Sequence, residues 1–270
     1  MNLLKYILLG ILQGFTEPLP ISSSGHLVLA KNLFNTNMIN DVNFEIIVNF
    51  GSFIAIVLIF WQDIIRLIKS FFTYILKKEK RASLHNDFHY CLLIIIGTIP
   101  VGLAGVLLKD KIDELSGNMT ILGIAFIITA IMLFIVKNSK GKKEDNDITI
   151  KDAITIGLIQ MVALMPGISR SGSVLVGCLL CGLSRKSSLK YTFMLYLPVS
   201  IASMLLGVKD LMETGISSSL LISYFLGGCA ACVVTYYSYK WLSKIVQNGR
   251  LWKFSIYCFL LGIFVLIYFR

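Results

Sequence analysis

The chain has 270 residues, 56% of them hydrophobic, and carries a formal net charge of +10 at pH 7. This composition excludes an ordinary soluble domain and predicts an integral membrane protein that folds as a single domain over residues 1–270. The positive charge does not indicate nucleic-acid binding, because the basic residues lie in loops between apolar runs, where they orient a chain in a lipid bilayer.

The first feature along the chain is a stretch over residues 10–26 that recurs over residues 157–173, without gaps and at a constant offset of 147. The matched residues are Gly10, Gln13, Ile21, Ser22, Ser24 and Gly25, which recur as Gly157, Gln160, Ile168, Ser169, Ser171 and Gly172. In both copies a short apolar run meets a Pro/Gly break and then a serine-rich loop. The apolar halves are too short to cross a bilayer, which predicts re-entrant helical hairpins over about residues 3–34 and 153–183.

Six further apolar runs are long enough to cross, since each approaches the ~20 residues that a bilayer core requires. They are Phe44–Trp61, Cys91–Leu108, Met119–Val136, Tyr191–Val208, Leu220–Trp241 and Leu251–Phe269. We therefore predict an all-α polytopic membrane protein built from two repeats, residues 1–147 and 148–270, each with one re-entrant hairpin and three transmembrane helices. An odd number of spans per repeat inverts the topology of the second repeat relative to the first.

The basic residues predict the orientation of this arrangement. They gather around residues 66–81, 137–151, 185–190 and 240–253, all on one predicted face, and the opposite face receives few. Because cytoplasmic loops carry the excess of Lys and Arg, that face is predicted to be cytoplasmic and both termini to lie outside.

The two serine-rich loops predict an anion-binding space near the middle of the bilayer. Each loop precedes a helix, so free backbone N–H groups and positive dipole ends point into the same space. Arg170 lies inside the second loop, and a guanidinium at this depth requires an anionic partner, for which phosphate oxygens fit its fork geometry. The predicted substrate-binding residues are Ser22, Ser24, Gly25, Gly167, Ser169, Ser171 and Gly172.

Glu17 is the only acid of the first hairpin and lies one turn after Gln13. One interpretation is a purely structural ion pair with Arg170, although buried pairs contribute little net stability. The other is a metal site. A divalent cation, magnesium or calcium, held by Glu17 and Gln13 would remove the repulsion between the carboxylate and a bound phosphate.

His26 follows the first serine loop, in the first turn of the next helix. A lone histidine at an apolar face is more often structural, but the neighbouring Ser23 and Ser24 allow a nucleophile–base pair. Our first hypothesis has Ser23 as the nucleophile with His26 assisting. Direct attack by a water molecule that His26 or Glu17 activates is the alternative.

These motifs resemble the bacitracin-resistance family of undecaprenyl-diphosphatases. That family combines an acid or Gln four residues before a Glu, a Ser-rich loop ending in Gly-His, and a distant Pro-Gly-x-Ser-Arg-Ser-Gly. Here the motifs lie at Gln13–Glu17, Pro20–His26 and Pro166–Gly172, and the resemblance extends over essentially the whole chain. By position, the resemblance gives catalytic roles to Glu17, Ser23, His26 and Arg170.

The resemblance implies an enzyme of the bacterial cytoplasmic membrane that hydrolyses undecaprenyl diphosphate to the monophosphate and phosphate. Hydrolysis would occur on the outer face with a divalent cation, recycle the carrier lipid for peptidoglycan synthesis and confer bacitracin resistance. The residues alone also allow a flippase or transporter of an anionic polyprenyl lipid, in which Arg170 binds without hydrolysis. A lipid phosphatase that uses a histidine after its Ser-Arg element does not fit, because no histidine follows Arg170. A structural scaffold leaves Arg170 unexplained, and whether the chain forms a homodimer stays open.

Overall fold

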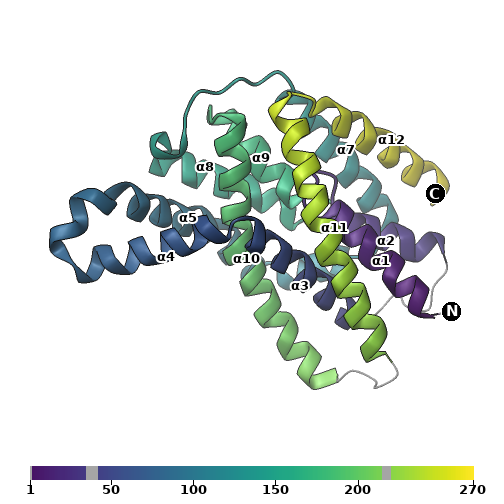
Figure 1. The fold of residues 1–270 in the computed structure, drawn as a ribbon. Helices are drawn as coiled ribbons and strands as arrows, with labels where there is room; N and C mark the ends of the chain where they lie inside the picture. The colour runs from purple at the N-terminus through teal and green to yellow at the C-terminus, as the bar shows by residue number, and fades with distance from the viewer. Residues whose placement is uncertain (1, 35–41, 215–219) are drawn as a thin grey trace.

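The computed structural model describes residues 2–34, 42–214 and 220–270, and over these residues the chain is helical with no strands. The α-helices are α1 (Asn2–Thr16), α2 (Ser23–Leu33), α3 (Val42–Ile59), α4 (Trp61–Leu76), α5 (Arg81–Leu107), α6 (Lys109–Leu115), α7 (Met119–Ile135), α8 (Ile150–Met161), α9 (Arg170–Leu180), α10 (Arg185–Thr214), α11 (Leu221–Gln247) and α12 (Trp252–Tyr268). Short 3₁₀ turns are η1 (Lys78–Lys80), η2 (Asp145–Asp147) and η3 (Val162–Leu164). Figure 1 shows α4 and α5 extending from one side of the bundle, and both chain termini on the other side.

Each of the six apolar runs expected to cross the membrane overlaps a helix. Within the described ranges, α5, α10 and α11 are long and apolar enough to span by themselves, and α3 with α4 qualifies as a pair that is bent by 76°. The remaining two, α7 and α12, are apolar helices of 17 residues each. The structure is therefore that of a multi-pass membrane protein, with the sharpest departure from the expected runs at the bend after α3.

The two repeated stretches each form a short helix, a break and a second short helix. In the first, Pro18 and Pro20 prevent α1 from continuing, and the backbone passes Ser22 at a φ of 70° before α2 begins. In the second, Pro166 and Gly167, which has a φ of 91°, separate η3 from α9. Both α2 and α9 have 11 residues and begin at equivalent positions of the repeat.

Glycines allow these short helices to pack closely against the long ones. A Cβ atom added to Gly10 in α1 would lie 2.2 Å from the carbonyl oxygen of Gly227 in α11, and one added to Gly157 in α8 would lie 2.5 Å from that of Gly97 in α5. Small residues permit this backbone contact between helices in membranes. The contacts fix the positions of α1 and α8, and with them the two breaks that follow.

Candidate active site

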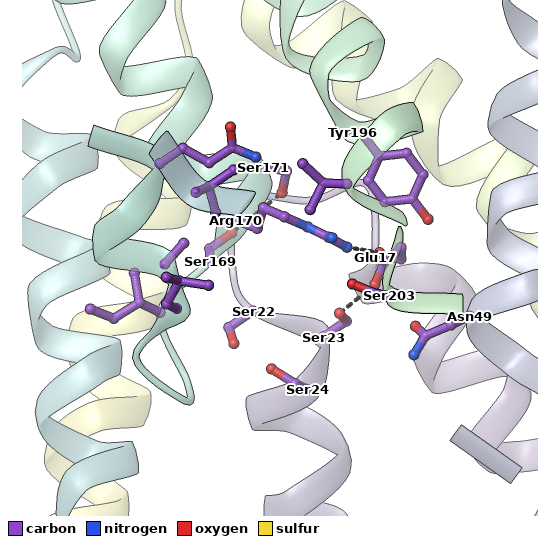
Figure 2. Close-up of a pocket in the computed structure, with 16 residues that line it drawn as sticks. Glu17, Ser22, Ser23, Ser24, Asn49, Ser169, Arg170, Ser171, Tyr196 and Ser203 are labelled. Carbon is purple, nitrogen blue, oxygen red and sulfur yellow. Dashed lines mark hydrogen bonds and ion pairs between the residues drawn. The ribbon is translucent and has the colours of Figure 1, made fainter. Parts of the chain in front are cut away.

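The two breaks meet at one pocket of about 230 Å³ in the interior of the bundle. Its polar lining consists of Glu17, Ser22, Ser23, Ser24, Asn49, Gln160, Ser169, Arg170, Ser171, Tyr196 and Ser203. Its apolar lining consists of Val101, Ala163, Leu164, Ile168 and Val199. Figure 2 shows the polar groups converging from α2, α9, α10 and the break after α1. The pocket therefore combines a polar wall from both repeated stretches with an apolar wall.

Glu17 is the centre of the polar wall. The Ser23 hydroxyl donates a hydrogen bond of 2.5 Å to its Oε2 atom, and the Gln13 amide donates one of 2.8 Å to the same oxygen. Nη2 of Arg170 lies 3.2 Å from the other oxygen, Oε1. The side chain of Glu17 is only 6% exposed, so three protein donors replace water as the hydrogen-bond partners of this carboxylate. Figure 2 shows the bonds from Ser23 and Arg170 reaching it from different sides.

Arg170 is the cation of the pocket. Its side chain is 32% exposed, and its guanidinium carbon lies 4.9 Å from the centre of the Tyr196 ring. Stacking on an aromatic ring orients the planar guanidinium, which has five N–H donors, many more than the bond to Glu17 uses. The arrangement leaves Arg170 able to bind an anion that enters the pocket.

Only some of the serines and glycines that we predicted as substrate-binding residues lie at the pocket. Of its members, Ser22, Ser24, Ser169 and Ser171 line the pocket, whereas Gly25, Gly167 and Gly172 do not. Gly25 and Gly172 each donate their N–H to the capping serine of their own helix, at 3.3 Å and 3.1 Å. Gly25 and Gly167 border a second cavity of about 360 Å³, which meets the site pocket at Ser24.

His26 is not brought together with Ser23. Its Nδ1 atom lies 2.7 Å from the carbonyl oxygen of Ser22, and its Nε2 atom 2.7 Å from the hydroxyl of Tyr257 in α12. The ring also stacks on Tyr257 and meets the edge of Phe126. Because the hydroxyl of Ser23 donates to Glu17, the carboxylate rather than the imidazole is placed to accept its proton.

Gln13 and Glu17 are the residues that we predicted as metal ligands. Nε2 of Gln13 also donates to Oδ1 of Asn49 at 2.6 Å, and its Oε1 atom is buried with no partner among the described residues. No cluster of three or more His, Cys, Asp or Glu side chains suited to a metal occurs in that part of the chain. A site built here therefore has one carboxylate and amide oxygens, a set of hard ligands that suits Mg²⁺ or Ca²⁺ when phosphate completes it.

Four polar residues of the pocket were not predicted as site residues from the sequence: Asn49 in α3, Gln160 in α8, and Tyr196 and Ser203 in α10. Each carried a weak signal, because each is a polar or amphipathic residue inside an apolar run. Asn49 and Tyr196 are also 147 residues apart, which is the offset of the repeat.

The helical fold and this pocket define the class of the protein: a multi-pass membrane protein with a pocket lined by polar side chains, among them Glu17 and Arg170. Residues 6–264 match the family model described as bacitracin resistance protein BacA, and the chain belongs to that family. It is 42% identical over 266 residues to "Undecaprenyl-diphosphatase 2" of Bacillus thuringiensis (strain Al Hakam), which covers 98% of this chain and 97% of the relative. It is 42% identical over 267 residues to "Undecaprenyl-diphosphatase 1" of Bacillus licheniformis, which covers 98% of each chain. A protein of Oceanobacillus iheyensis named "Undecaprenyl-diphosphatase" is 38% identical over 269 residues, 99% of this chain and 97% of the relative.

Proposed function

We propose that the protein hydrolyses undecaprenyl diphosphate to undecaprenyl phosphate and inorganic phosphate. Relatives that match nearly the whole chain carry the name of this activity. The observation that carries the proposal is the triangle of Glu17, Ser23 and Arg170 in one pocket, because it joins a nucleophile, a base and an anion-binding cation. The apolar wall of the same pocket suits the first isoprene units of the lipid.

Ser23 is the nucleophile in the mechanism that we favour. Its Oγ atom forms a bond to the terminal phosphorus while its proton passes to Oε2 of Glu17, which already accepts that hydrogen bond. The bond from this phosphorus to the bridging oxygen breaks, and the lipid monophosphate leaves. Water then attacks the phosphoserine and the bond from phosphorus to Oγ breaks. Oγ recovers its proton from Glu17, and both protons of the water leave with the phosphate as dihydrogen phosphate. Attack by water that Glu17 activates directly is the alternative.

Arg170 binds the terminal phosphate and exchanges its contact with Glu17 for the phosphate oxygens, which frees the carboxylate to act as a base. The hydroxyls of Ser22, Ser24, Ser169 and Ser171 supply further contacts. His26 holds the backbone of the first serine loop through Ser22 and Tyr257, and in this role it supports Ser23 rather than touching the substrate.

A divalent cation, magnesium or calcium, fits the buried oxygens of Glu17 and Gln13, and when bound it would neutralise negative charge on the phosphate oxygens. Its removal is a direct test. Phosphate release measured after EDTA treatment should fall, and added Mg²⁺ or Ca²⁺ should restore it. Unchanged release in EDTA would contradict a metal requirement while leaving the hydrolase proposal intact.

We also propose that the two repeated stretches are re-entrant hairpins of inverted topology, over about residues 3–34 and 153–183, within repeats 1–147 and 148–270. The gapless repeat and the equivalent starts of α2 and α9 support this. The distribution of basic residues supports a cytoplasmic membrane location with both termini outside and the pocket open to the outer face. Hydrolysis there would return the carrier lipid to peptidoglycan synthesis and confer bacitracin resistance.

Purified protein in detergent tests the activity. Wild-type protein should release inorganic phosphate from undecaprenyl diphosphate, and Arg170→Ala should reduce the rate by ~10³-fold or more, because it removes the charge that binds the reacting phosphate. Arg66→Ala is the matched control, since Arg66 is half-exposed at the protein surface, paired with Asp63 and Asp87. Binding of the lipid without phosphate release by the wild type would refute hydrolysis and favour a flippase or transporter.

A further inference from the structure

The amide of Gln160 is a buried polar group that the mechanism above does not use. Gln160 lies near the end of α8, its side chain is 0% exposed, and the residue lines the site pocket. Neither Nε2 nor Oε1 of this amide has a hydrogen-bond partner among the residues that the structure describes. A buried amide with no partner bears the full cost of its desolvation, and native proteins rarely keep one unless a ligand or water completes it.

The repeat explains why this amide lacks partners. Gln160 corresponds to Gln13, whose Nε2 donates to Glu17 and to Asn49. At the offset of 147, Glu17 corresponds to Leu164 and Asn49 to Tyr196. The second stretch thus keeps the glutamine and replaces both of its acceptors, one of them by an apolar side chain.

We infer that Gln160 is a substrate-binding residue, and that its Nε2–H group donates to a phosphoryl oxygen of the diphosphate. This inference rests on the proposed function and deepens it. The amide N–H of Gln160 lacks a hydrogen-bond acceptor, and diphosphate oxygens are strong acceptors. Gln160 and Arg170 line the same pocket, so a diphosphate bound to Arg170 would lie beside this amide. A second cation in the pocket would pair with Glu17 as well as with the phosphate. A neutral amide can bind the phosphate without competing for Glu17.

The variants Gln160→Leu and Gln160→Met remove the amide and keep most of the side-chain volume. We expect KM for undecaprenyl diphosphate to rise about tenfold or more and kcat to change less than about threefold, since the lost hydrogen bond to a charged group holds the bound substrate and the transition state alike. The inhibition constant of inorganic pyrophosphate, a probe of the head-group site alone, should rise by the same factor. The thermal midpoint without substrate should not fall, because the substitutions remove two unsatisfied atoms.

A KM and a pyrophosphate inhibition constant within twofold of wild type, in either variant with an unchanged thermal midpoint, would overturn the inference. So would a fall in the thermal midpoint of both variants with no change in the inhibition constant, because that pattern marks a structural role. Failure of the proposed function is a separate result, namely no phosphate release by the wild type. In that case, pyrophosphate stabilisation of the wild type that is lost in Gln160→Leu would still support an anion contact, and equal stabilisation would refute it.

Discussion

Replacing Glu17 by Gln should remove the base of the reaction while keeping the shape of the site. A Gln side chain retains a carbonyl oxygen that can accept the hydrogen bond of Ser23, but it cannot take the proton. General-base catalysis contributes about 10²–10⁴-fold to a rate, so we expect kcat to fall by about 10³-fold, equivalent to ~4 kcal/mol in the barrier.

Glu17→Gln should change the stability of the protein much less than it changes the rate. Opposite charges 3.2 Å apart attract by about 5 kcal/mol at an effective dielectric constant of 20. The 32% exposure of Arg170 and the cost of burying Glu17 offset most of that attraction, so the free energy of unfolding should fall by only about 1–2 kcal/mol. The protein therefore stays folded at the assay temperature, and lost activity reports lost chemistry.

The assay is phosphate release from undecaprenyl diphosphate at saturating substrate, accompanied by thermal unfolding of each variant. Glu79→Gln, in the exposed turn η1, is the control for a lost carboxylate and should behave as wild type. Because Glu17 and Ser23 act on one proton, the double variant Glu17→Gln with Ser23→Ala should be little worse than either single variant. A Glu17→Gln enzyme within tenfold of the wild-type kcat, or single losses that multiply in the double variant, would refute the base assignment.

Ser23→Ala should lower kcat by about 10²-fold or more if the serine is the nucleophile, and near-normal release with no trapped phosphoserine would favour direct attack by water. Gly10→Ala should lower the free energy of unfolding by about 1–3 kcal/mol, because its Cβ would lie 2.2 Å from a carbonyl oxygen of α11, whereas Gly102→Ala, with open space, should be neutral or stabilising. Burial raises the pKa of Asp152, but hydrogen bonds from Lys143 and the helix N-cap outweigh this and lower it. The stabilisation from Asp152 is thus present above about pH 4, the ordinary value, and is lost as pH falls through the lowered pKa. Asp152→Asn should therefore lower the thermal midpoint at pH 7, with a difference that shrinks in acid; a constant difference across pH would contradict this.

Much of the site geometry followed from two features of the sequence: the gapless repeat and the shortness of its apolar halves. These features predicted that the two repeated stretches would meet, and the structure joins Glu17 to Arg170, 153 residues apart, by an ion pair. The capped starts of α2 and α9 were also predictable, because Ser before a helix accepts from the N–H three residues on.

The orientations of single side chains inside the hairpins were not predictable. The sequence placed His26 directly after the serine loop, but whether its ring faces Ser23 or α12 depends on tertiary packing, and Tyr257 lies 231 residues away in the sequence. Asn49 and Tyr196 lie in helices whose apolar residues are spread over all faces, and a periodic pattern does not reveal which face either residue occupies in such a helix. The bend of 76° between α3 and α4 likewise has no Pro or Gly at Phe60 to mark it.

The differences between the two repeated stretches explain how one pocket obtains opposite charges. Ser23 and Arg170 occupy the same position, the first residue of an 11-residue helix that a serine caps, yet one bears a nucleophilic hydroxyl and the other a cation. Identical copies would place two carboxylates or two guanidiniums at close range, and like charges at that distance cannot both stay ionised without large cost. Divergence at positions 17 and 164, and at 23 and 170, instead produces a carboxylate on one side and a guanidinium on the other. The first copy then supplies the groups that form and break bonds and the second supplies Arg170, so a variant that exchanges Ser23 and Arg170 should keep the backbone geometry and lose the hydrolysis.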